Sequence, residues 1–238
     1  MKKVTLSTIL GGLLLVQMAG GVFLNFRFLG IFKSDIFTVE MSSLTTALGF
    51  ATLMALMLSF INVVVGVIAA KRFQSQLPIF SLLVILVASL GLILTGVEYA
   101  NLANYTAFIG DVQAKGLHEL SESMEFIRRL IVSERNESHY LSLFFSSFSL
   151  FLFYALLYRA TRIPKLLLAF AMTACLLQLI ALGSTFFQGP VIVSIQLPLF
   201  ITQVVMPVYF ILYGFRANSN GIADDVKTNS VLNSHEEI

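Results

Sequence analysis

Residues 166–215 read LLLAFAMTACLLQLIALGSTFFQGPVIVSIQLPLFITQVVMPVYFILYGF and contain no charged residue. As a single helix this run would be about 75 Å long, whereas the hydrocarbon core of a bilayer is about 30 Å thick. The run must therefore turn, and Gln188-Gly189-Pro190 supplies residues that favour a turn. The stretch predicts two membrane-spanning helices, over residues 166–187 and 191–214.

The rest of the chain has the same apolar character. Hydrophobic residues make up 57% of the 238 positions and charged residues 12%, and the mean hydropathy is +0.87. Such a composition is typical of an integral membrane protein. Further apolar windows, each long enough for one helix, cover residues 4–26, 42–70, 77–98 and 139–158. We therefore expect an all-α, polytopic bundle of six transmembrane helices in one domain, residues 1–216, whose partner is a lipid bilayer and not nucleic acid.

Basic residues predict how the bundle is oriented. The short connections on one side of the predicted bundle hold Lys71, Arg72, Arg159 and Arg162 but no acidic residue, whereas acidic residues outnumber basic ones on the other side. The positive-inside rule then places both termini in the cytoplasm. The polar segment 217–238 has no hydrophobic periodicity and is expected to be a disordered cytoplasmic tail.

The N-terminal segment also has features of a cleaved signal peptide. Lys2 and Lys3 precede an apolar run that ends near Ala19. Gln17 would then stand three positions before the cut, where a small residue is required. We therefore expect residues 4–26 to be a retained helix.

A charged stretch at residues 116–140, GLHELSESMEFIRRLIVSERNESHY, follows the third predicted span. Its apolar residues recur at helical spacing, which predicts an amphipathic helix over residues 117–135, on the membrane surface or capping the bundle on the outer side. Asn136 or Ser138 is expected to cap the next helix. The apolar face consists of Leu117, Leu120, Met124, Ile127 and Ile131.

Candidate binding residues lie at the outer ends of the third and fourth predicted spans. Glu98, Asn101 and Tyr105 recur at spacings of three and four, which predicts a polar stripe on one helix face. An ionisable Glu98 that faces the bundle would mark a site, but it would be an ordinary headgroup-level residue if the helix has already left the hydrocarbon. His139 is a protonatable group that faces either a cavity or water.

Three glutamines fall near the middle of predicted spans. Gln17, Gln178 and Gln203 either line a polar pocket or hydrogen-bond between helices as packing devices. The ligand-binding candidates are thus Glu98, Asn101, Tyr105, His139, Gln17, Gln178 and Gln203. The sequence contains no HExxH or CxxC motif, so we predict no catalytic residue and no metal ligand, and it indicates neither a cofactor nor an oligomeric state.

The C-terminal third contains FYALLYRATRIPKLLLAFAMTACLLQLIALG, followed by the last predicted helix. Residues 138–216 resemble the bacterial membrane proteins grouped as domain of unknown function 4386, because Tyr158-Arg159, Pro164 and Gly214 stand at the corresponding places. The resemblance implies a bacterial inner-membrane bundle and supplies no function. Such sequences often carry a glutamate in the last helix, where this chain has Gln203.

Three functions are compatible with these features. The first, and the one we favour, is a non-enzymatic membrane protein that binds a lipid or another hydrophobic ligand within the bundle, as a sensor or an accessory subunit. The second is a small transporter or channel that uses the polar stripe at the outer end of the third helix. The third is an intramembrane enzyme at the outer face, with His139 or His118 as base and Glu98 as its partner, but no nucleophile motif accompanies these residues.

Overall fold

A computed structural model describes residues 5–187 and 189–214 of the chain. Six helices within these residues are long and apolar enough to cross a membrane, the last of them together with the 3-10 turn before it. The predicted tail, residues 217–238, lies outside the described residues. The helices are α1 (Leu6–Arg27), α2 (Met41–Phe73), α3 (Pro78–Ala114), α4 (Glu122–Ala160), α5 (Lys165–Gly183) and α6 (Leu197–Leu212), with 3-10 turns η1 (Leu29–Lys33), η2 (Ser184–Phe187) and η3 (Val193–Gln196).

The charge-free run folds as two helices, as predicted. Helix α5 ends at Gly183, and the chain turns through η2 and η3 before α6 begins at Leu197. In this turn the backbone N–H of Gly189 donates to the carbonyl oxygen of Ser184 at 2.9 Å. A Cβ atom at position 189 would lie 2.9 Å from the same oxygen, so the turn requires glycine. The predicted start of the last helix at residue 191 is too early, because η3 occupies residues 193–196.

The third and fourth helices are longer than predicted. Helix α3 continues past residue 98 to Ala114, and α4 runs unbroken from Glu122 to Ala160. The prediction of a separate amphipathic helix over residues 117–135 is therefore wrong. Ser121 caps α4, since its side chain accepts from the backbone N–H of Met124. The two predicted caps lie inside the helix instead, where Ser138 Oγ donates to the carbonyl oxygen of Glu134 at 2.7 Å.

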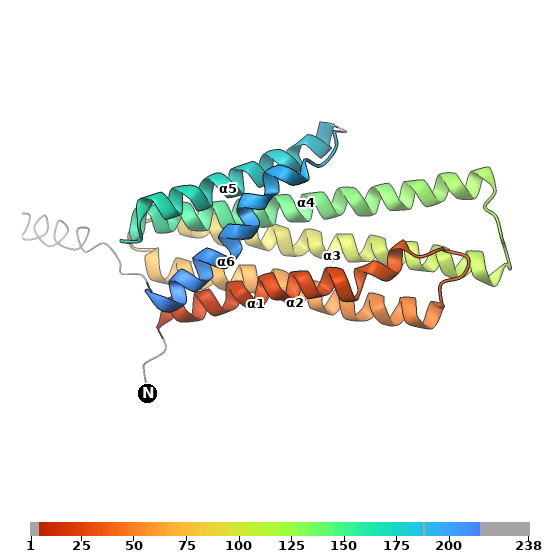
Figure 1. Cartoon of the computed structure of the whole chain (residues 1–238), viewed down its shortest axis with the longest axis horizontal. Coiled ribbons are helices and arrows are strands. Elements are labelled where there is room, and N and C mark those ends of the chain that lie inside the picture. The colour runs from red at the N-terminus through yellow and green to blue at the C-terminus, as the bar shows by residue number, and fades with distance from the viewer. Residues whose placement is uncertain (1–4, 188, 215–238) are drawn as a thin grey trace, which may run out of the picture.

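Three helices extend well beyond the others at one end of the molecule. Helices α2, α3 and α4 contain 33, 37 and 39 residues, and about 50–58 Å of helix exceeds the thickness of the hydrocarbon core. Figure 1 shows that these three helices continue past α5 and α6, and that the connection between α3 and α4 lies at the far end. The beginning of α1 lies at the opposite end.

An exposed apolar stripe on α3 indicates which part of this helix faces lipid. The stripe begins at Ile79 and ends at Val97. Its members recur every three or four residues and so share one helix face. This segment is about 27 Å long, close to the hydrocarbon thickness, so Glu98 stands at the end of the lipid-facing segment that is nearer the extended end of the molecule. The stripe consists of Ile79, Leu82, Leu86, Leu90, Ile93 and Val97.

The buried apolar residues form two clusters at different heights in the bundle. One surrounds Phe73, Tyr154 and Phe210 near the end where α1 begins. The other surrounds Leu44 and Ile109 near the extended end. Between the two clusters, helices α1 to α4 carry small and polar residues. A polar layer therefore separates the two apolar clusters.

Candidate functional site

Glu98 on α3 is buried and contacts two basic side chains of α4. Its carboxylate is 6% exposed. His139 Nδ1 lies 2.8 Å from Glu98 Oε1, and Arg135 Nη2 donates to the same oxygen at 3.3 Å. A carboxylate at this depth is stabilised by opposite charge and by hydrogen bonds, and both are present. The structure therefore places an ionisable cluster where the lipid-facing segment of α3 ends, towards the extended end of the molecule.

This cluster forms because α4 is one continuous helix. Arg135 and His139 are four residues apart, so an unbroken helix presents both on the face that packs against α3. Sequence reasoning identified Glu98 and His139 as candidates but assigned Arg135 to a different helix, and so missed it as a partner. The spacing of Arg135 and His139 would have revealed the shared face if the helix had been read as continuous.

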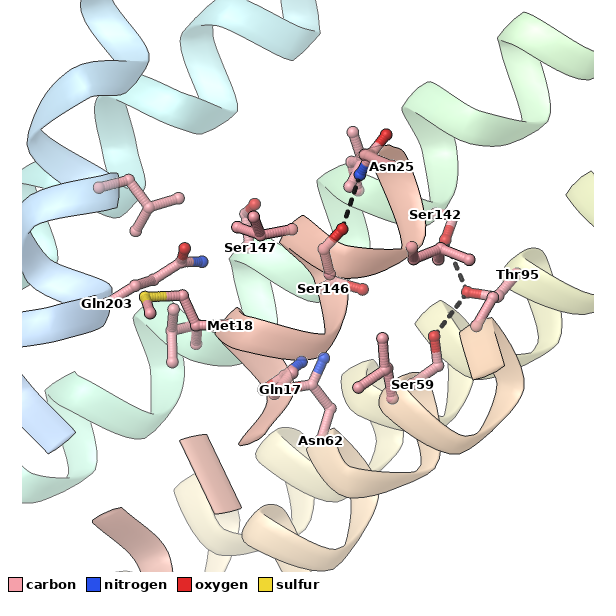
Figure 2. A pocket seen from close by; sticks show the side chains of 18 of the residues that line it. Gln17, Met18, Asn25, Ser59, Asn62, Thr95, Ser142, Ser146, Ser147 and Gln203 are labelled. Atoms are coloured by element: carbon pink, nitrogen blue, oxygen red, sulfur yellow. Dashed lines mark hydrogen bonds between the residues drawn. The ribbon is translucent and has the colours of Figure 1, made fainter. Parts of the chain in front are cut away.

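Hydroxyl groups continue the polar contacts one turn deeper. Thr95 Oγ1 lies 2.8 Å from Ser59 Oγ on α2 and 2.8 Å from Ser142 Oγ on α4, and it donates to the carbonyl oxygen of Gly91 at 2.9 Å. Figure 2 shows these contacts, which join α2, α3 and α4 through Ser59, Thr95 and Ser142. Sequence reasoning did not single out Ser59 or Ser142, because isolated serines in apolar helices carry no distinctive pattern.

A cavity of about 480 Å³, here called the bundle cavity, opens beside this cluster. All six helices contribute to its lining. Glu98 and His139 line its outer end, and apolar side chains such as Leu14, Leu58 and Leu199 form much of the wall. Its volume falls within the range of small-molecule binding pockets, about 300–1,000 Å³.

Four amide side chains also line the bundle cavity. They are the three predicted glutamines, Gln17, Gln178 and Gln203, together with Asn62. Figure 2 shows Gln203 extending from α6 and Gln17 and Asn62 on α1 and α2. Within the described part of the chain, none of the four side-chain amides hydrogen-bonds to another residue. None of their nitrogen or oxygen atoms is both completely buried and without a hydrogen-bond partner. Of the two interpretations of the glutamines, the structure thus favours the polar pocket over interhelical packing.

Pro207 adds one further polar group near this cavity. Proline has no backbone N–H, so it cannot donate to the carbonyl oxygen of Gln203, four residues earlier in α6. The carbonyl oxygen of Gln203 therefore lacks the donor four residues later that it would have in a regular helix.

The remaining predicted residues lie elsewhere. Asn101 packs against α4, where its Nδ2 donates to Ser138 Oγ at 2.8 Å. Tyr105 is buried and lines a second cavity farther out. The predicted stripe thus divides: Glu98 faces the bundle cavity, Asn101 joins two helices, and Tyr105 belongs to the outer region.

The described residues contain no group of three or more side chains suited to hold a metal ion. His118, the other candidate base, lies in the connection before α4, outside any helix.

Comparisons of the chain with family models, with curated proteins and with solved structures gave no match. The function must therefore be inferred from the cavity and from the groups that line it.

Proposed function

We propose that this protein binds a small amphiphilic or hydrophobic ligand in the bundle cavity, without chemical conversion. One observation carries the proposal: six helices surround a single cavity with apolar walls, and four unpaired amides line it. An apolar wall provides affinity for hydrocarbon, and a few polar groups fix the orientation of a ligand.

The unpaired amides favour ligand binding over a purely structural role. Gln178 is buried and Gln17, Asn62 and Gln203 are half-buried, and none of the four has a polar atom that is sealed and unsatisfied. Their amide groups are therefore open to the cavity, whereas amides that serve packing alone would be expected to pair with each other. Gln17 and Gln203 are on helices that contact each other, yet no hydrogen bond joins their side chains in the described structure. Water or a ligand with hydrogen-bonding groups would satisfy them.

Native mass spectrometry of protein purified in mild detergents tests the proposal. We expect a retained small-molecule mass on the unmodified protein and its loss in Gln17→Leu and Gln203→Leu, because leucine keeps the approximate volume and removes the amide. Gln196→Leu is the matched control, since Gln196 lies in η3 and does not line the cavity. Absence of any bound mass across several detergents, or equal loss in the control, would contradict ligand binding in this cavity.

A second candidate is transport coupled to protonation. Glu98 is the only carboxylate among the described residues that line the bundle cavity, and its contact with His139 provides a route for proton exchange. Proton flux into proteoliposomes under an imposed potential tests it, with Glu98→Gln as the variant. Flux that persists unchanged in Glu98→Gln, or no flux from the unmodified protein, would exclude this mechanism.

Catalysis is not part of the proposal. The 2.8 Å contact would let Glu98 orient His139 as a base. In the described part of the chain, however, no hydroxyl or thiol group hydrogen-bonds to His139, so an activated nucleophile is missing.

We further propose that the protein resides in a bacterial inner membrane with both termini in the cytoplasm. The asymmetry of basic residues supports this orientation. The resemblance to domain of unknown function 4386 supports the bacterial assignment. In this orientation the extended ends of α2, α3 and α4 project on the outer side.

A further inference from the structure

A second cavity, of about 670 Å³, lies farther along the extended helices and is here called the outer cavity. Lys33 of η1 and Arg128 and Arg135 of α4 line it, together with His139. No carboxylate occurs among the described residues of its lining. Its walls therefore present hydrogen-bond donors and positive charge, whereas the bundle cavity is lined mainly by apolar side chains and neutral amides.

The two arginines of the outer cavity are positioned by carboxylates that do not line it. Arg128 donates to Glu125 through Nε at 2.8 Å and through Nη2 at 2.6 Å. Arg135 donates to Glu98 at 3.3 Å and to Asn136 Oδ1 at 3.2 Å. These contacts fix each guanidinium group and leave other N–H groups available, as expected for a preorganised anion site.

Lys33 supplies a positive charge without a carboxylate partner. It is exposed and forms no ion pair with the described residues. An anion in the outer cavity would pair with this ammonium group. The Nε atom of Arg135 is sealed and makes no hydrogen bond, so only the Nη groups of that residue would contact the anion.

The two cavities adjoin each other. Asn25, Phe26 and Leu29 at the end of α1 line both, and so does His139 of α4. The boundary lies at the height of Glu98, where the lipid-facing stripe of α3 ends. A molecule at this boundary would have one part among cations outside the hydrocarbon and the other part among apolar side chains within it.

We propose that the outer cavity binds the phosphate or carboxylate group of an anionic amphiphile whose apolar part enters the bundle cavity. This inference rests on the proposed function and specifies the class of ligand. The amphiphile spans the boundary at His139, with its anionic group close to Lys33, Arg128 and Arg135.

Binding of two single-chain lipids that differ only in the headgroup tests the inference. Lysophosphatidic acid and lysophosphatidylcholine with the same acyl chain are titrated against the purified full-length protein, and binding is measured by native mass spectrometry. We expect at least about tenfold tighter binding of lysophosphatidic acid, the effect of one charge-assisted hydrogen bond. Equal affinity for the two lipids would overturn the inference.

Variants locate the headgroup. Lys33→Gln and Arg128→Gln are each expected to weaken lysophosphatidic acid about tenfold and to leave lysophosphatidylcholine unchanged. Arg129→Gln is the matched control, because Arg129 has the same charge, is adjacent in sequence and does not line the outer cavity. Equal weakening by Arg129→Gln would show a general surface-charge effect and overturn the inference.

Two further measurements separate the sources of failure. Competition between inorganic phosphate and lysophosphatidic acid would support an anion site. Tight binding of phosphate, together with equal binding of the two lipids, would mean that the outer cavity binds a free anion, and it would overturn the proposal of an anionic amphiphile. Binding of both lipids that depends on Gln203 but not on headgroup charge would retain the proposed function and reject only this inference.

Discussion

Glu98 is the residue on which the candidate site depends. Its side chain is nearly buried, and Arg135 and His139, 23% and 30% exposed, are its polar partners. Removing one partner leaves the buried Glu98 carboxylate with fewer stabilising contacts, which costs free energy. Removing the carboxylate charge at the same time relieves that cost. The cluster should therefore behave as a unit and not as a sum of separate contacts.

The variant Arg135→Gln is expected to lower the free energy of unfolding by about 1–3 kcal/mol, a range below that of fully buried pairs because the arginine is partly exposed. The double variant Glu98→Gln/Arg135→Gln should recover part of that loss. Thermal unfolding in detergent measures both. Additive costs of the two single variants would mean that the residues do not interact energetically.

How much of this cluster the sequence predicts depends on the residue. Glu98 and His139 are predictable candidates, because ionisable groups that border apolar spans are unusual. Arg135 is not a predictable candidate, because charged residues flank it on both sides and the segment resembles an ordinary solvent-exposed stretch. The amides Gln17, Gln178 and Gln203 are predictable as polar groups at mid-depth, but only the three-dimensional arrangement shows that they share one cavity.

Glu40 provides a residue-scale test away from the site. It precedes α2, and its carboxylate accepts from Ser42 Oγ at 2.5 Å and from Ser43 Oγ at 2.9 Å. These hydrogen bonds favour the ionised form and lower the pKa of Glu40 below its ordinary value. The resulting stabilisation is fully present above the unfolded-state pKa and is lost as the pH falls through the lower, folded-state pKa.

NMR titration of a carboxyl-labelled sample measures the Glu40 pKa directly. We expect Ser42→Ala/Ser43→Ala to raise that pKa towards the ordinary value. An unchanged pKa in the double variant would show that the two hydroxyl groups do not stabilise the carboxylate.

At the scale of elements, close approach of α1 and α6 depends on a single glycine. A Cβ atom at Gly11 would lie 2.6 Å from the carbonyl oxygen of Pro207, whereas one at Gly12 would meet nothing within 4 Å. The backbone of α6 cannot move aside as a flexible side chain can. We therefore expect Gly11→Ala to destabilise the protein by about 1–3 kcal/mol.

Gly12→Ala is the matched control for this prediction. It adds the same methyl group to the neighbouring position and should be neutral or stabilise α1 by up to about 1 kcal/mol, because alanine is the better helix former. Thermal unfolding of both variants under identical conditions measures the difference. Similar melting temperatures would mean that α1 and α6 are not packed closely at Gly11.

The extent to which the elements are predictable follows from their composition. Apolar windows identify six helices because a bilayer requires long uninterrupted runs. They underestimate α3 and α4, because the outer parts of these helices are polar and give no such signal. Those parts are stabilised by tertiary contacts, such as Gln113 Nε2 donating to the carbonyl oxygens of Ile36 and Val39 at 3.0 and 2.8 Å.

At the scale of the whole molecule, each cavity has a different set of helices around it, because some helices are longer than others. The bundle cavity lies where all six helices are present. The outer cavity lies where α5 and α6 no longer contribute and the lining comes from the end of α1, η1, α3 and α4. An amphiphile with an anionic group matches this change from an apolar to a cationic lining only if the extended end faces away from the hydrocarbon.

The orientation of the bundle determines which side of the membrane the outer cavity faces, and two serine-to-cysteine variants test it. Ser123 is exposed in the extended part of α4, and Ser75 is exposed in the connection between α2 and α3 at the opposite end. The native Cys175 is buried and should contribute little background labelling. With both termini inside, a membrane-impermeant maleimide should label Ser123→Cys in intact bacterial cells and Ser75→Cys only after permeabilisation, because the positive-inside rule places Lys71 and Arg72 in the cytoplasm. The reverse labelling pattern would place Lys33, Arg128 and Arg135 in the cytoplasm, and ligands of the outer cavity would then have to come from that side.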